Sequence, residues 1–410
     1  MSGKESKDKK ARDGIGKMNI LAQAEEWKEE LTEIRRYLHQ NPEPSMREFQ
    51  TTAYVRDFLS QRQISWIEAG PTGTVAVIHG KSTAPVIGLR ADLDALEMEE
   101  LNDVPYRSRC PGLMHACGHD AHTASLLCAA VWLQEHRYEI DATVKLIFQP
   151  GEESGEGAQS IVESGAVSDV DGIFALHTAS SLPTGTVSIR AGAMSAANDK
   201  FRIWITGRGC HGSTPQKGMD ALLAGTALVQ TLQSLITRES DPLKPAVMTI
   251  GIFRSGTAFN VLPENAYIEG SVRVLEESQR PVNREIISRM AENTAAAYRC
   301  RVKTEFECTA KVVYNDEHLT EVAKAAAAEL LGSDQVLEQP FSLGAEDFGS
   351  FLDVCPVTYL NVGSGNAEKG TDYPHHHGKF DVDEDILPTC MALYIQFVRF
   401  YSQPQQLLSE

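Results

Sequence analysis

The stretch PVIGLRADLDAL, residues 85–96, decides the fold, because it is a short apolar run that ends in two aspartates. Three other segments share this apolar character, and stretches with helical spacing of apolar residues lie among them. They are TVAVIHG (74–80), ATVKLIFQPGEE (142–153) and DGIFALHT (171–178). Short buried strands that alternate with helices are typical of a parallel sheet. We therefore predict an α/β domain with a mostly parallel sheet covered by helices.

Residues 196–309 have a different character from the rest of the chain. Their pattern follows the order strand, helix, strand, strand, helix, strand, which is typical of a ferredoxin-like α+β unit. After residue 309, the alternation of strands and helices seen before residue 196 returns. We therefore predict a large domain built from residues 18–195 and 310–410, with the ferredoxin-like domain inserted between its two parts. Residues 1–17 are rich in charge, and we predict a disordered leader there.

The size and charge of the chain exclude some classes of protein. Its 410 residues exceed the usual extent of one hydrophobic core, which favours two domains. Acidic residues outnumber basic ones by 56 to 38, and this excess argues against a nucleic acid or an anionic membrane as partner. The cysteines form no CxxC pair, and the sequence has no signal peptide and no apolar run of ~18 residues. We predict a cytoplasmic protein.

Ligand-type side chains follow several of the predicted strands. They are Asp92 and Asp94, Glu152 and Glu153, His177, and the run His375, His376 and His377. In open α/β sheets, ligands bind beyond the carboxyl ends of the strands. We therefore expect these acids and imidazoles to be aimed at one place.

The segment MHACGHDAHTA, residues 114–124, allows two interpretations. His115 and His119 have the i,i+4 spacing of a helical metal-binding pair, although Gly118 lies between them and no Glu follows His115. Alternatively, a loop presents Cys117 and His119 together as ligands, and the helix begins near Asp120 with that side chain as its N-cap. We prefer the second interpretation. A buried structural cysteine with a capping histidine is the plainer alternative.

The pair Glu152 and Glu153 follows an apolar strand and a Pro-Gly turn. Two adjacent carboxylates in a partly buried cleft repel each other unless a cation compensates. Neighbouring side chains at a strand end point in different directions, so one can bind metal while the other faces a bound water. A metallohydrolase needs this division, since the carboxylate outside the ligand set accepts the proton of the water. We assign Glu152 as the base and Glu153 as the ligand, but the order within the pair is open.

With these motifs in view, the chain resembles the M20 family of metallopeptidases, in particular its amidohydrolase branch of aminoacylases, hippurate hydrolases and auxin-conjugate hydrolases. The resemblance extends from about Leu31 to Phe400. Its motifs are RRYLHQNPEPS (35–45), RADLDAL (90–96), HACGHDAH (115–122), FQPGEESGEGA (148–158), ALH (175–177), HGSTP (211–215), GTAFNVLPENAYIEGSVR (256–273), GAEDF (344–348) and HHHGKF (375–380). The family fold implied is a metallohydrolase catalytic domain with an inserted domain that serves as lid and dimerisation domain.

The resemblance also implies a site with two divalent metal ions per subunit. Its metal ligands would be Cys117, His119, Glu153, His177 and His376. His376 is chosen because the ligand histidine of this branch lies four residues before an aromatic residue, here Phe380, and His375 or His377 remains an alternative. Asp94 would occupy the position of the aspartate that supports the metal centre. Sulfur and nitrogen ligands favour Zn²⁺ or another borderline metal over Mg²⁺, with Mn²⁺, Co²⁺ and Ni²⁺ as alternatives.

In the inserted domain, His211, Asn260 and Arg273 match positions that stabilise the tetrahedral intermediate or hold a substrate carboxylate in related enzymes. Donors and positive charge suit both tasks. The resemblance further implies a homodimer formed through this lid, in which His211 reaches the site of the partner subunit. A structural turn at His211 and a solvated arginine at Arg273 are the plainer alternatives.

The function implied is hydrolysis of the amide bond of small N-acyl-L-amino acids. Two alternatives are a dipeptidase or carboxypeptidase of the same family, and a catalytically silent metal- or amino-acid-binding protein on the same fold. Glu97, where the family has Pro, and Ser213-Thr214, where it has Ala-Met, are departures that put the acyl preference in doubt.

Overall fold

The computed structural model describes residues 19–403, so the predicted leader at 1–17 lies outside the described residues. A ten-stranded sheet forms the centre of the larger domain, with the main order β1-β2-β4-β3-β5-β16-β14-β7. Its strands are β1 (Ser65–Ala69), β2 (Gly73–His79), β3 (Val86–Asp92), β4 (Thr143–Gln149), β5 (Gly172–Pro183), β6 (Val187–Ile189), β7 (Gly192–Ser195), β14 (Val313–Asn315), β15 (Val336–Glu338) and β16 (Val357–Gly365).

The four strands at the centre of this sheet are parallel. β3 lies between β4 and β5, and β16 continues the parallel pairing on the other side of β5. The predicted α/β fold with a mostly parallel sheet is therefore confirmed. The strand over 74–80 differs from its neighbours, because β2 pairs antiparallel with both β1 and β4 at one edge.

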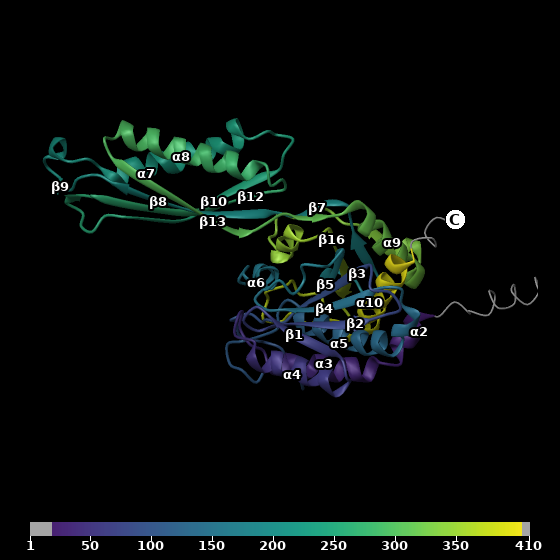
Figure 1. The fold of residues 1–410 in the computed structure, drawn as a ribbon. Coiled ribbons are helices and arrows are strands. Elements are labelled where there is room, and N and C mark those ends of the chain that lie inside the picture. The colour runs from purple at the N-terminus through teal and green to yellow at the C-terminus, as the bar shows by residue number, and fades with distance from the viewer. Residues whose placement is uncertain (1–18, 404–410) are drawn as a thin grey trace, which may run out of the picture.

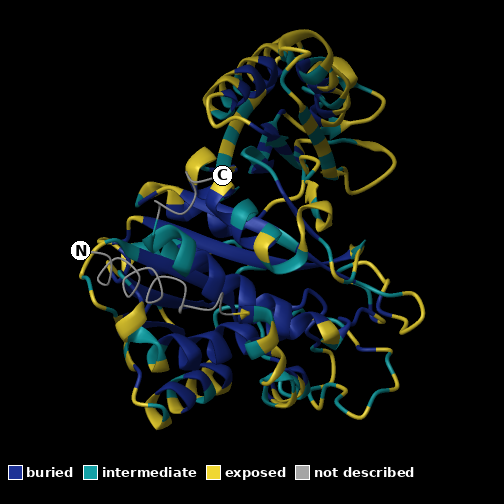
Figure 2. Ribbon diagram, turned by 90° about the vertical axis from the view of Figure 1, so that its right-hand side faces the viewer, coloured by how far each residue is buried: buried dark blue, intermediate teal, exposed yellow. Residues whose placement is uncertain are grey.

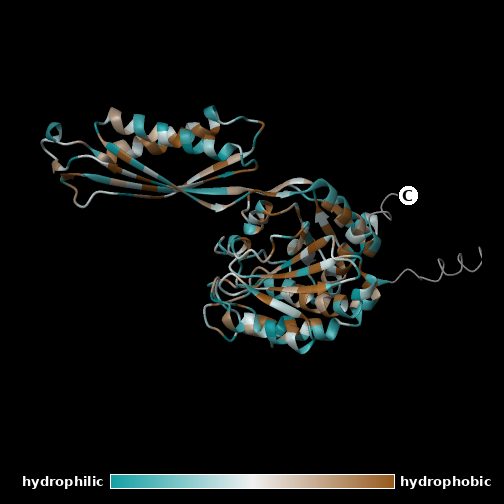
Figure 3. Cartoon of the chain, in the orientation of Figure 1, coloured by the Kyte–Doolittle hydropathy of each residue, from teal (hydrophilic) through white to brown (hydrophobic). Residues whose placement is uncertain are grey.

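Both faces of the sheet are buried, as the dark strands in Figure 2 show. Successive residues of one strand enter two different cores: Phe174 and Leu176 face one, while Ile173 and Ala175 face the other. This two-sided burial explains the nearly continuous apolar character of the strands, which Figure 3 displays. The helices of the domain are α2 (Ile20–Glu25), α3 (Lys28–Gln40), α4 (Phe49–Gln61), α5 (His119–Glu135), α6 (Gly157–Glu163), α9 (Glu317–Leu331) and α10 (Leu387–Ser402).

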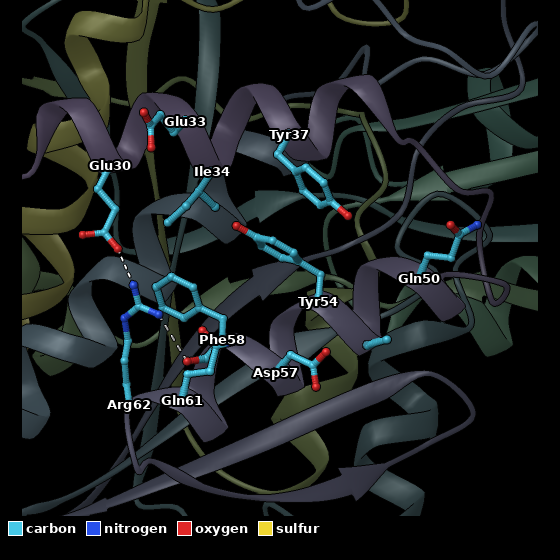
Figure 4. A pocket seen from close by; sticks show the side chains of 11 residues that line it. Glu30, Glu33, Ile34, Tyr37, Gln50, Tyr54, Asp57, Phe58, Gln61 and Arg62 are labelled. Atoms are coloured by element: carbon cyan, nitrogen blue, oxygen red, sulfur yellow. Dashed lines mark hydrogen bonds and ion pairs between the residues drawn. The ribbon is translucent and has the colours of Figure 1, made fainter.

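Helix α5 lies innermost and is buried from His119 to Leu133, with α3 and α10 packed against it. On the outer side, α3 and α4 contact each other through Tyr37 and Tyr54, whose stacked rings are 4.4 Å apart. Figure 4 shows the groove of about 640 Å³ between these two helices. Among the described residues that line it, none is a predicted site residue.

The smaller domain has its own sheet and core. Its antiparallel sheet has the order β10-β12-β8-β13, and the burial of β8 alternates because α7 and α8 cover one face. The predicted order of strands and helices is present. Its elements are β8 (Ala197–Thr206), β9 (Cys210–His211), α7 (Ala221–Ser234), β10 (Ala246–Ser255), β11 (Val261–Leu262), β12 (Asn265–Val274), α8 (Gln279–Ala297) and β13 (Arg301–Ala310). The boundaries at 195/196 and 309/310 stay predictions.

Figure 1 shows that this domain projects from the larger one, with β8 and β13 running toward it and β9 at the far end. Both crossings between the domains therefore lie beside β7 and β14 of the large sheet. Within residues 19–403, no helix combines the length and the apolar character needed to cross a bilayer.

Candidate metal centre

The five predicted ligands lie together beyond the ends of the central strands. Ligand atoms of Cys117, Glu153 and His376 are all within 4.8 Å of one another. The Sγ atom of Cys117 is also 3.4 Å from Nε2 of His177. His119 forms a second group with both Glu152 and Glu153, so Glu153 belongs to both groups. The expectation that distant segments aim acids, imidazoles and a thiol at one place agrees with this geometry.

The turn before α5 creates the Cys117 and His119 arrangement. Gly118 has a φ of +88°, and a Cβ atom there would lie 2.2 Å from Oγ1 of Thr178. Only glycine fits this turn without strain. Because His115 and Cys117 precede the helix and His119 begins it, the helical pair of His115 and His119 does not form.

The predicted N-cap is wrong. Helix α5 begins at His119, its N-cap is Gly118, and Asp120 lies inside the first turn. The Asp120 carboxylate is buried and accepts a 2.8 Å hydrogen bond from Nε of Arg35. The local capping rule fails because this distant arginine engages the side chain.

The hydrogen bonds of His119 and His177 decide which ring nitrogen of each is on the side of the ligand cluster. Nδ1 of His119 lies 2.9 Å from the carbonyl oxygen of Asp94, and Nδ1 of His177 lies 2.6 Å from that of Thr178. Each ring therefore donates through Nδ1, which leaves Nε2 as the nitrogen on the side of the ligand cluster, where Nε2 of His177 lies 3.4 Å from Sγ of Cys117. Within the part of the chain that the structure describes, buried Nε2 of His119 has no hydrogen-bond partner, and Oε1 of Glu153 lies 3.2 Å from Nε2 of His376. A buried nitrogen without a partner beside a carboxylate fits a bound cation.

Asp94 organises the turn that carries the two glutamates. Its carboxylate accepts the backbone N–H of Glu152 at 3.1 Å and that of Glu153 at 3.0 Å, and it also lies 3.2 Å from Nδ1 of His119. Oγ of Ser45 donates a further bond of 2.6 Å. Although burial opposes ionisation, the hydrogen bond and the charge of His119 hold the pKa of Asp94 below its usual value.

The environment of Glu152 raises the pKa of its carboxyl group, which suits a proton acceptor. Burial, together with the carboxylates of Glu346 and Asp347, raises the pKa of Glu152 well above its ordinary value. A carboxyl group with a raised pKa is a better base in its ionised form. A cation bound beside it would counteract part of this shift.

Asp92 was expected among the ligand-type side chains aimed at the site, whereas His122 was not, and the structure places both in a close buried group with His119 and His177. Both nitrogens of His122 are engaged: Nδ1 donates to Asp92 at 2.6 Å, and Nε2 accepts the N–H of Thr178 at 2.9 Å. His122 therefore supports its neighbours and has no free lone pair for a metal. The sequence motifs already hinted at these residues, since Asp92 lies two positions before Asp94 and His122 lies three positions after His119.

Arg90 is a second residue that the sequence did not reveal as part of the site. It is buried and donates to Asp92 at 2.7 Å and to Glu346 at 3.2 Å. Tyr359 also donates its hydroxyl to Glu346 at 3.0 Å. The buried acids behind Glu152 are thus partly neutralised by one arginine.

A cavity of about 370 Å³ opens beside the ligand cluster. It is lined by Cys117, Glu152, Glu153, His177, Ala179, Ser181, Met194, Ser195, Gln339, Ser342, Gly344, Ala345, Glu346, Tyr359, Asn361, His375 and His376. His375 lies beside His177 at a ring distance of 5.2 Å, but it belongs to none of the close ligand groups among the described residues. The lining is mostly small and polar, which suits a small polar substrate.

The three predicted lid residues are not brought to this cavity together. His211 and Asn260 are neighbours, because Gly212 donates its N–H to the carbonyl of Asn260 at 2.8 Å. They lie at and next to β9 and β11, at the end of the small domain that points away from the larger domain in Figure 1. Arg273 on β12 donates at 2.8 Å to the carbonyl of Leu343, whose neighbours Ser342 and Gly344 line the cavity.

Together, the α/β sheet, the ligand cluster at its strand ends and the adjacent carboxylate define a metal-binding hydrolase. Residues 88–399 match the family described as Peptidase family M20/M25/M40. The chain belongs to this family, and its recognition from the sequence motifs is confirmed.

Several relatives align over most of the chain. Thermostable carboxypeptidase 2 of Saccharolobus solfataricus is 37% identical, over 90% of this chain and 94% of that protein. N-acetyl-L-cysteine deacetylase of Bacillus subtilis is 35% identical, over 87% of this chain and 85% of that protein. The solved structure of the YxeP protein of Bacillus subtilis, described as a dinuclear metal binding peptidase from the M20 family, has a TM-score of 0.82 and 33% identity. It covers 92% of this chain and 99% of that one.

Proposed function

We propose that the protein is a binuclear metal-dependent amidohydrolase that cleaves the amide bond of N-acyl-L-amino acids and releases a carboxylate and a free amino acid. The observation that carries the proposal is the position of Glu153, which groups with Cys117 and His376 on one side and with His119 and Glu152 on the other. Among the described residues, Nε2 of His119 is also buried there without a hydrogen-bond partner. Relatives named N-acetyl-L-cysteine deacetylase and IAA-amino acid hydrolase support this substrate class.

The ligands of the two metals are Cys117, His119, Glu153, His177 and His376. One thiolate and three imidazoles favour Zn²⁺, or Mn²⁺, Co²⁺ or Ni²⁺, over Mg²⁺. Metal ions in such a site polarise the substrate carbonyl and make water acidic near neutral pH. His376 is preferred to its neighbours because its Nε2 lies 3.2 Å from Oε1 of Glu153.

The chain's own residues supply the proton transfer and the orientation. Glu152 accepts the proton of the attacking water and returns it to the nitrogen of the leaving amino acid. Asp94 fixes the backbone of Glu152 and Glu153 through the two N–H bonds. In the small domain, Arg273 binds the substrate carboxylate at the cavity of its own chain. Asn260 and His211 reach the site of the partner subunit of a homodimer, where Asn260 binds the substrate carboxylate and His211 stabilises the developing oxyanion. We place this dimer in the cytoplasm.

A peptidase of the same family is the second candidate, because the relatives include two thermostable carboxypeptidases. A dipeptidase needs a free acid for the substrate amine. Glu346 lines the cavity, but Arg90 and Tyr359 already engage its carboxylate, which favours a blocked, uncharged acyl group. Comparing N-acetyl amino acids with unblocked dipeptides separates the two candidates, and faster dipeptide hydrolysis would overturn our preference.

Replacing Glu152 with Gln tests the mechanism. We expect kcat to fall by at least about 10³-fold, since general acid–base catalysis is removed, while bound metal measured by atomic absorption stays unchanged. Glu156→Gln is the matched control, because Glu156 is exposed in the same loop and should retain full activity. An active Glu152→Gln enzyme would contradict the assignment. Substrate binding without turnover in the unaltered protein would instead support the silent binding protein.

A further inference from the structure

A second group of charged side chains is buried behind the metal centre, between α3, α5 and residues 381–384. The group comprises the buried residues Arg35, His39, Glu100, Asp120 and Asp381, and the partly exposed Glu384 at its edge. Among the described residues that line the cavity, none belongs to this group. It therefore has no direct contact with a substrate there.

Arg35 is the centre of this group and has no exposed surface. Its guanidinium donates to Asp120 through Nε at 2.8 Å and to Asp381 through Nη2 at 2.6 Å. A third bond of 3.2 Å runs from Nη1 to Glu384. The planar fork of arginine makes these bonds in three fixed directions, which the single ammonium group of lysine does not reproduce.

The two shorter bonds end on segments that carry proposed metal ligands. Asp120 directly follows His119, and Asp381 follows His376 by five residues. The backbone N–H of His376 also donates at 2.9 Å to the carbonyl of Ala116, next to Cys117. The arginine thus connects the turn 116–120 with the segment 376–381.

Overall stability is a weak reason for this arrangement. Removing a guanidinium and several carboxylates from water costs several kcal/mol per ion, and well-packed apolar residues often replace buried ion pairs without loss of stability. What apolar residues do not provide is a fixed direction between two backbone segments. The ligand atoms of Cys117 and His376 lie within 4.8 Å of each other, and this short span depends on those two segments.

We propose that Arg35 is a positioning residue that holds the His119 turn and the His376 segment at the spacing required for metal binding. The inference rests on the proposed metal centre. It adds that metal affinity depends on a residue of α3 that touches neither metal nor substrate.

Binding of Co²⁺ alone to metal-stripped protein tests the inference. A thiolate ligand to Co²⁺ gives a near-ultraviolet charge-transfer band, so titration of this band reports metal held by Cys117 without any need for activity. We expect Arg35→Lys to weaken Co²⁺ binding by about 10–100-fold, the usual effect of losing a group that orients a metal ligand. Arg36→Lys is the matched control, because within residues 19–403 the hydrogen bonds of the Arg36 side chain go to the partly exposed Glu384 alone. This variant should bind Co²⁺ as the unaltered protein does.

All titrations are made at a temperature at which circular dichroism shows each variant folded. A purely structural Arg35 would lower the unfolding temperature yet leave the Co²⁺ affinity of the folded protein within about twofold, and that result would overturn the inference. Should Arg35→Lys not fold, Asp381→Asn replaces it, since it removes one charge partner at the edge of the group. Unchanged affinity in Asp381→Asn would overturn the inference equally. Absence of the thiolate band in the unaltered protein would contradict the proposed metal centre itself.

Discussion

At the scale of single residues, the site depends on carboxylates that are not ligands. Asp94 binds the backbone of both glutamates and the ring of His119 at once. Asp92 accepts a hydrogen bond from the ring of His122, and Arg90 donates to both Asp92 and Glu346. The chemistry of each ligand is therefore set by hydrogen bonds one step further from the metal.

Asp94→Asn should weaken metal binding by about 10–100-fold, measured by chelator competition. An amide keeps one acceptor but turns an NH₂ group toward a backbone N–H, so the Glu152 and Glu153 turn loses at least one bond. Ser45→Ala is the control, because it removes one hydrogen bond to Asp94 and leaves the carboxylate in place. A variant Asp94→Asn with unaltered affinity would show that the turn holds its shape without this residue.

His39 predicts a pH dependence of stability. Burial and Arg35 oppose its protonation, but hydrogen bonds to Asp120 and Glu100 outweigh them and raise the pKa of His39 to about 9. Because this pKa lies above the ordinary value of 6.5, the stabilisation is complete below pH 6.5 and is lost as the pH rises through 9.

The free energy of urea unfolding should therefore decline between pH 6.5 and 9, by up to about 3 kcal/mol from this residue. The same decline should be absent in His39→Gln. Parallel pH curves for the two proteins would mean that His39 does not carry the extra proton.

At the scale of elements, the start of α5 is the decisive feature. The order of strands and helices, including the inserted βαββαβ unit, was predictable because apolar periodicity is a local property of the sequence. The antiparallel pairing of β2 and the capping of α5 were not, since both depend on contacts with distant segments. The loop that presents Cys117 and His119 was expected, whereas the engagement of His122 was not.

Gly118→Ala should lower the free energy of unfolding by at least about 2 kcal/mol. It combines a left-handed backbone with a side chain driven into Thr178. Gly112→Ala is the control, because Gly112 has a similar φ of +75° and no described atom lies within 4 Å of its added Cβ. The control should cost only about 1 kcal/mol. An equal loss of unfolding free energy in the two variants would mean that the contact with Thr178 contributes nothing to the effect.

At the scale of the whole molecule, the candidate site residues are distributed over two domains. The large sheet gathers the ligand cluster, and the small domain carries the remaining candidate residues on a separate sheet. The motifs of the small domain gave no sign of how far His211 lies from the cluster of its own chain. That separation is set by the lengths of β8 and β13 and by the direction in which they leave the larger domain, as Figure 1 shows.

His211→Ala tests the role of the small domain. We expect kcat to fall by about 10²-fold or more, since one oxyanion donor is lost, with metal content and fold unchanged. Mixing inactive His211→Ala with inactive Glu152→Gln should restore part of the activity when each chain supplies what the other lacks. Failure of such mixtures, after subunit exchange has been demonstrated, would restrict His211 to its own chain.

The placement of β9 at the remote tip has a kinetic consequence. A tip that swings onto its own cluster works equally well at any enzyme concentration, whereas one that serves a neighbour stops working when the chains separate. The turnover number per chain can be measured during serial dilution into the nanomolar range. It stays constant if His211 serves its own chain, and it falls on dilution if His211 serves the partner subunit.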